Sequence, residues 1–166
     1  MRLNIKELVG AIKKPPLELA LYLAMMETRG ESLDTRTQAG KTILHIAARY
    51  PVVDTIKVLV AAGADPNAQC NRGETPLITA CAYLQAPVAR ALLESGADVN
   101  KTDMEGWSPL LVVCDGYTED RQSLLDLLLE WKVDIHHKSS DHWTARLLAE
   151  CLKDEQVRDT LLAKLQ

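Results

Sequence analysis

The chain alternates between short apolar stretches and clusters of turn-forming residues. The clearest pair of apolar stretches covers residues 77–83 and 88–94, each long enough for about two helical turns. Thr75 precedes this pair, and its hydroxyl can accept a backbone N–H of the first turn; Pro76 follows at a position that has no N–H to satisfy. Gly96 closes the pair, because glycine readily adopts positive φ. The pattern predicts pairs of short helices.

The same pattern recurs along the chain with a fixed period. Gly40, Gly73 and Gly106 each open a Thr- or Ser-containing signature, and they follow one another at equal intervals of about 33 residues, within the range of periods that marks repeat architectures. Lys132 takes the position of Gly96 in the next unit but lies beyond the place that the period requires, so three residues are inserted within that unit. A helix pair this short cannot bury its apolar face alone, so we expect the units to stack on one another.

The repeat resembles the ankyrin repeat, whose unit has about 33 residues and the signature T-P-L-H-x-A. The resemblance is strongest in Thr42-Ile43-Leu44-His45-Ile46-Ala47 and Thr75-Pro76-Leu77-Ile78-Thr79-Ala80 and covers nearly the whole chain. It implies an all-α solenoid of stacked helix-turn-helix units with short β-turn tips. Residues 1–166 are expected to form one domain, made of an N-terminal cap (1–36), three internal repeats (37–69, 70–102 and 103–138) and a C-terminal cap (139–166).

The two caps are also expected to be helical, although they depart from the signature. The N-terminal cap should hold helices over residues 3–12 and 17–28, and the C-terminal cap helices over 147–152 and 156–165. Arg146 stands where the signature usually has leucine. A terminal repeat needs a polar outer face, which accounts for this substitution.

Composition narrows the classes of function. Of 166 residues 47% are apolar, only 4% are aromatic, and Phe is absent, which favours close-packed helices over a β-sandwich. The formal charge of -4, with no run of five basic residues, argues against nucleic-acid binding. The first residues match no signal peptide and no stretch is long enough to span a membrane, so we expect a soluble, cytoplasmic protein.

Cysteines and histidines are the candidates for redox or metal chemistry. Cys81 and Cys114 lie one period apart and no CxxC spacing occurs, so buried free thiols are favoured over a disulfide, redox or zinc site. His136, His137 and His142 cluster in sequence, but their spacing matches no known closed metal site. No catalytic motif or phosphate loop is present. We therefore expect no cofactor, no metal and no enzyme activity.

The aromatic residues indicate a binding surface. Ankyrin repeats usually bind partners through their turn tips and first helices, and five of the seven Trp and Tyr residues fall in those slots. For the tyrosines, packing between repeats is an equally good interpretation; for the two tip tryptophans we favour exposure, because turn tips offer little to bury against. The residues predicted to bind a partner are Lys41, Arg49, Tyr50, Arg72, Glu74, Tyr83, Met104, Glu105, Trp107, Asp115, Tyr117 and Trp143.

The function that the resemblance implies is binding of another protein through the concave face. The chain would act as an inhibitor, an immunity-like protein or an adaptor, and would be a monomer on its own. A regulatory or targeting subunit that self-associates is the alternative, and a metal protein or enzyme is the least favoured one. The three-residue insertion, within residues 115–122, is either part of the binding face or a harmless longer loop. The resemblance also makes Asn67 and Asn100 candidates for hydroxylation.

Overall fold

Helices form the regular structure of the chain. The computed structural model describes residues 10–12, 14–28, 33, 35–115, 118–152 and 155–166, and within these residues no strand is present. The predicted all-α class is therefore confirmed. None of the described helices combines the length and the apolar character needed to cross a bilayer.

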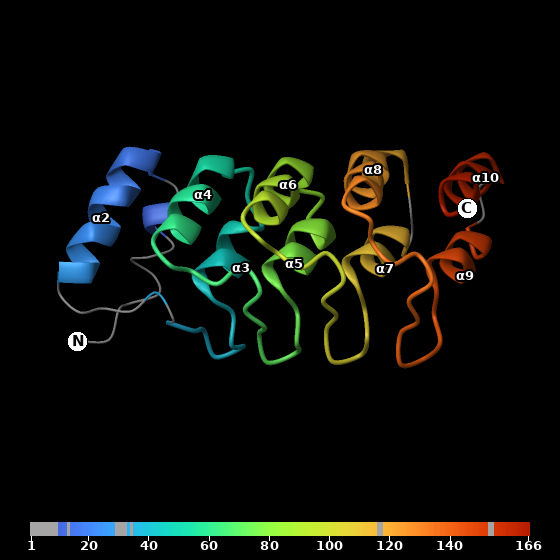
Figure 1. Ribbon diagram of the computed structural model, residues 1–166, viewed down its shortest axis with the longest axis horizontal. Coiled ribbons are helices and arrows are strands. Elements are labelled where there is room, and N and C mark those ends of the chain that lie inside the picture. Colours follow the sequence, from blue (N-terminus) through green and yellow to red (C-terminus); the bar gives the residue numbers. More distant parts are fainter. Residues whose placement is uncertain (1–9, 13, 29–32, 34, 116–117, 153–154) are drawn as a thin grey trace.

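The helices stack as successive pairs (Figure 1). Their bounds are α2 (Pro16–Thr28), α3 (Ile43–Ala47), α4 (Val53–Ala61), α5 (Pro76–Ala82), α6 (Ala86–Glu94), α7 (Pro109–Cys114), the 3-10 turn η1 (Glu119–Arg121), α8 (Gln122–Glu130), α9 (Ala145–Glu150) and α10 (Glu155–Lys164). Helices α3, α5, α7 and α9 form an inner layer, helices α2, α4, α6, α8 and α10 form an outer layer, and the turn tips project from the inner side. The molecule is elongated along the stacking direction.

The inner helices begin where the sequence predicts. Thr75 Oγ1 accepts the Ile78 N–H at 3.2 Å, Ser108 Oγ accepts the Leu111 N–H at 3.3 Å, and Thr144 Oγ1 accepts the Leu147 N–H at 3.1 Å. Such caps satisfy backbone donors that the first helical turn leaves unpaired. The predicted helices agree with α2, α5, α6, α9 and α10 to within two residues at each end. Of the predicted helix 3–12 the structure describes only residues 10–12, which are helical.

The core runs continuously through the stack. Leu44, Leu77 and Leu110 occupy one repeat position and are each at most 1% exposed. Ala47 and Ala80 follow at another position that is fully buried, and their small side chains allow neighbouring helices to approach closely. The apolar face that each helix pair cannot cover alone is thus covered by its neighbour, as the repeat predicts.

The turn tips are joined by backbone hydrogen bonds in a fixed register. The N–H of Asn71 donates to the carbonyl of Ala39 at 3.0 Å, and one repeat later the N–H of Met104 donates to the carbonyl of Arg72 at 3.0 Å. Ser140 repeats the contact with Glu105 at 2.9 Å. Because successive tips are bonded directly, side chains from different tips are held side by side.

The insertion lies where the sequence predicts, between the helices of the third internal repeat. Helix α7 starts one period after α5, whereas α8 starts later than one period after α6, and η1 occupies part of the added length. Arg121 Nη1 donates to the carbonyls of Val112 at 2.8 Å and Asp115 at 2.6 Å. The guanidinium therefore caps the carboxyl end of α7 and ties the longer connection to it.

The cysteines are free, and three of them, Cys70, Cys81 and Cys114, are buried. Burial raises the pKa of the Cys81 and Cys114 thiols to about 12, although the charge of Arg121 lowers both slightly. At neutral pH these thiols lack the thiolate that attacks an alkylating reagent.

We expect iodoacetamide to label the exposed Cys151 promptly in the folded protein at neutral pH, and Cys81 and Cys114 only in denaturant. Peptide mapping by mass spectrometry reads each site, with Cys151 as the internal control. Equal labelling rates at Cys151 and Cys81 would contradict the buried, protonated state of Cys81.

Candidate functional site

A hollow of about 560 Å³ lies between the turn tips and the inner helices α5 and α7. Three successive tips contribute to it, together with the inward side chains of α5 and α7. Its lining consists of Ala39, Lys41, Cys70, Arg72, Glu74, Ile78, Thr79, Ala82, Tyr83, Asp103, Glu105, Trp107, Val112 and Asp115. The volume falls in the range of ligand-binding pockets, which is roughly 300–1,000 Å³.

The hollow brings together most of the residues that were predicted to bind a partner. Those that line it are Lys41, Arg72, Glu74, Tyr83, Glu105, Trp107 and Asp115. Outside the lining, Arg49, Met104 and Trp143 are exposed and Tyr50 is half-buried. Tyr117 lies outside the described residues.

The two tip tryptophans differ in exposure, so the prediction for one of them is corrected. Trp143 is 37% exposed, as expected for a tip. Trp107 occupies the same position one unit earlier, but it is half-buried and packs against the core. The reason is the register of the tips: Ser140, in the next tip, is bonded to the carbonyl of Glu105, so a neighbour lies directly alongside Trp107.

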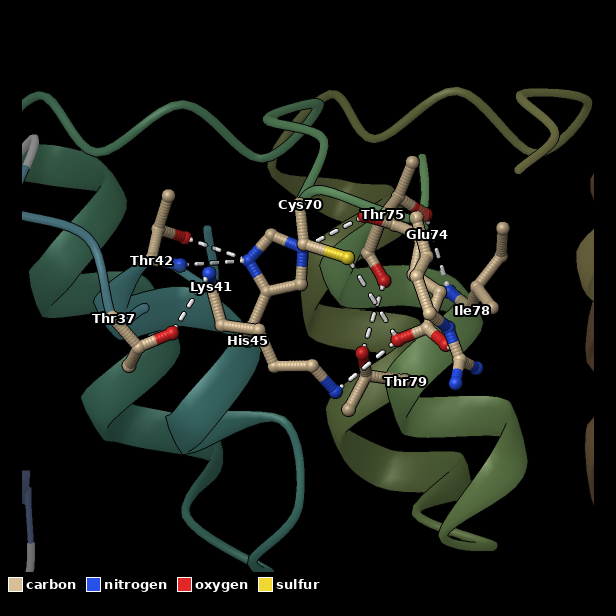
Figure 2. Close-up of polar contacts among 10 residues, drawn as sticks. Thr37, Lys41, Thr42, His45, Cys70, Glu74, Thr75, Ile78 and Thr79 are labelled. Atoms are coloured by element: carbon tan, nitrogen blue, oxygen red, sulfur yellow. Dashed lines mark hydrogen bonds and ion pairs between the residues drawn. The ribbon is translucent and has the colours of Figure 1, made fainter. Parts of the chain in front are cut away.

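Glu74 is predicted to bind a partner, but only 13% of its side chain is exposed. Its carboxylate pairs with Lys41 of the preceding tip, with Nζ–Oε2 at 3.1 Å (Figure 2). It also pairs with Arg72. Burial by itself would raise the pKa of Glu74, but the hydrogen bonds and charges of Lys41 and Arg72 together outweigh it and lower the pKa below its ordinary value. The three residues form a charged cluster that links two tips.

Tyr83 and Arg49 are paired on the same face. Tyr83 is 45% exposed, and the Arg49 guanidinium carbon lies 4.8 Å from the centre of its ring. This distance is typical of a cation–π contact. The exposed ring favours the binding interpretation for Tyr83, whereas the half-buried Tyr50 keeps the packing interpretation open.

His45 connects the first two repeats at the edge of this cluster (Figure 2). Its Nδ1 accepts the backbone N–H of Thr42 at 3.1 Å, and its Nε2 lies 2.8 Å from the carbonyl oxygen of Glu74. A carbonyl can only accept, so Nε2 carries the proton and the ring is neutral. Burial of the ring, then the charges of Lys41 and Arg36, lower the pKa of His45, against the opposing effect of Glu74.

The lining also contains residues outside the predicted binding set. These are Ala39, Cys70, Ile78, Thr79, Ala82, Asp103 and Val112. Ile78 and Thr79 belong to the repeat signature, so they were assigned to folding alone. Asp103 Oδ1 accepts the N–H groups of Glu105 at 2.9 Å and Trp107 at 2.8 Å, which fixes the shape of the third tip. An Asp that starts a turn in this way is the only signal that could have identified it.

The histidines of the C-terminal region make separate contacts. His137 Nε2 lies 2.8 Å from the carbonyl oxygen of Gly106, and the backbone N–H of His136 donates to Asp134 at 2.9 Å. Among the described residues, no three His, Cys, Asp or Glu side chains are grouped so that they could hold a metal ion.

The stacked helix pairs, bonded tips and continuous core define a helical repeat protein. The family model described as "Ankyrin repeats (3 copies)" matches residues 8–103, which is more than half of the chain. The chain therefore belongs to the ankyrin-repeat family, and the fold predicted from the repeat period is confirmed. No curated protein matches the chain. Ankyrin repeats generally mediate protein–protein interactions and are typically not enzymes.

Proposed function

We propose that this chain is a non-enzymatic binding module that holds a partner protein on its concave face, centred on the hollow. The observation that supports the proposal is that different positions of each repeat serve the core and the surface. Signature residues such as Leu77 and Leu110 are buried in the stack, whereas the positions that vary between repeats, such as Arg72 and Glu105, line the hollow. Binding energy at protein interfaces is concentrated in Trp, Tyr and Arg side chains, and the hollow carries all three types.

The proposed contact surface has a centre and an edge. The centre consists of the hollow residues, and the edge is formed by exposed residues beside it, Arg49, Met104 and Trp143. Residues 1–166 are proposed to act as one domain located in the cytoplasm. An inhibitor that blocks a partner's own site and an adaptor that joins two proteins would both use this face, and the fate of the partner's activity in the complex distinguishes them.

Replacing Tyr83 or Trp107 with Ala is expected to reduce partner capture by tenfold or more, because truncating an interface anchor costs about 2 kcal/mol. The measurement is affinity capture from an extract of the source cells, quantified by mass spectrometry. Trp131→Ala is the matched control, since Trp131 is 37% exposed and does not line the hollow.

Circular dichroism and thermal unfolding check that each variant remains folded. This check matters most for Trp107, which packs against the core; Tyr83 is more exposed and serves as the second variant. Partners retained by both hollow variants but lost with Trp131→Ala would overturn the proposed site. Light scattering tests the alternative of self-association, which predicts a stable dimer.

A further inference from the structure

The charges in the hollow are only partly paired with one another. Four carboxylates and two cationic side chains line it, which leaves an excess of two negative charges. Both cations, Lys41 and Arg72, are bound to Glu74. The remaining carboxylates of the lining are Asp103 and Glu105, in the third tip, and Asp115, which follows the last residue of α7.

The carboxylates of Glu105 and Asp115 are available to a ligand. Within the described part of the chain, neither side chain takes part in an ion pair or a side-chain hydrogen bond, and both residues are exposed. The guanidinium of Arg121 donates to backbone carbonyls at the end of α7, including that of Asp115, and is not paired with the Asp115 carboxylate. An incoming cation would therefore not have to displace an ion pair between described residues.

An aromatic ring accompanies these carboxylates. Trp107 lines the same hollow, and indole is the side chain that attracts cations most strongly through its ring face. Tyr83, the other aromatic side chain of the lining, already has the guanidinium of Arg49 on its ring. The concave face thus already holds one cation–π contact, between Arg49 and Tyr83. Trp107 offers a second ring on which a cation of the partner could make the same contact.

We propose that the hollow accepts an arginine side chain of the partner protein, with its guanidinium against Trp107 and its N–H groups donating to Glu105 and Asp115. This inference rests on the proposed function and specifies the chemistry of the partner. Arginine fits better than lysine, because its planar guanidinium can pair with carboxylates through two hydrogen bonds, stacks on aromatic rings and is weakly hydrated. An acidic segment would be repelled by the three carboxylates.

The test starts from a random peptide library displayed on phage and selected against the full chain. Peptides are kept only if they bind the natural chain and fail to bind the Tyr83→Ala variant. This substitution reports on the hollow without altering its carboxylates. We expect one arginine to recur in these binders. In a synthetic peptide, replacing that arginine by citrulline, its neutral isostere, should weaken binding to the natural chain by about tenfold, as expected for loss of a charge-assisted contact.

The same replacement is then measured on two double variants. On Glu105→Gln/Asp115→Asn the citrulline peptide should bind as well as the arginine peptide, whereas on Asp54→Asn/Glu94→Gln the tenfold difference should persist. The control residues Asp54 and Glu94 are exposed on the outer helices α4 and α6, and their substitution changes the net charge by the same amount.

The outcomes separate the two proposals. Hollow-dependent binders that lack arginine, or that are indifferent to citrulline, overturn the arginine inference and leave the proposed function standing. A selection that yields no binder sensitive to Tyr83→Ala overturns both.

Discussion

Gly73→Ala is expected to destabilise the protein by about 3 kcal/mol, of which about 1–2 kcal/mol is backbone strain at positive φ and the rest steric overlap. Gly73 has φ +77, and a Cβ atom there would lie 2.6 Å from the backbone nitrogen of Met104 in the next tip. That nitrogen donates to the carbonyl of Arg72. Relief of the overlap must therefore break the bond that holds two tips in register.

Gly96→Ala is the matched control for this substitution. Gly96 has φ +90, but its added Cβ would meet nothing within 4 Å, so only the backbone strain of about 1–2 kcal/mol should remain. Chemical denaturation of the two variants under the same conditions gives both values. Equal losses of stability would mean that the close approach of the tips is not maintained in solution.

The fold was predictable because a fixed period places equivalent residues of successive units at known positions along the chain. The equal spacing of Gly40, Gly73 and Gly106 locates the tips of the three internal repeats, since a residue that tolerates positive φ is favoured there. Two positions depart from this rule: His142, in the C-terminal cap, takes the glycine position with φ +64, and Lys132, in the third internal repeat, takes the position of Gly96 with φ +55. Their identities gave no sign of this conformation; only their places in the period did.

The composition of the hollow was less predictable, because exposure at a tip depends on the tip that follows it. Trp107 and Trp143 occupy the same position, yet only the first has a described tip bonded alongside it. Glu74 likewise looks like a free surface charge in the sequence, and its burial follows from Lys41, one period earlier in the chain. Such pairings require the relative placement of side chains, which the period does not specify. The insertion was located correctly, but Tyr117 within it lies outside the described residues.

His45→Ala is expected to cost about 3 kcal/mol, because it leaves a cavity at a fully buried site and removes the partner of the Thr42 N–H. It should also alter the response to acid. The pKa of His45 lies below 6.5 in the folded protein, so the unfolded chain takes up the proton first. The contribution of His45 to stability is complete above about pH 6.5 and declines as the pH falls toward the lowered pKa.

His45→Ile separates the acid response from the cavity. In the next repeat Ile78 takes this position and is only 4% exposed. There the N–H of Ile78 donates to the side chain of Thr75, which caps the helix. The carbonyl of Glu74 keeps the N–H of Cys70 as a donor at 3.0 Å, so the loss of stability should be smaller than for Ala. Denaturation curves between about pH 7.5 and 5 should show stability falling in the natural chain but less steeply in both variants. If the natural chain and the Ile variant lose stability in parallel, the acid response comes from other groups and His45 is not the neutral ring inferred from its two hydrogen bonds.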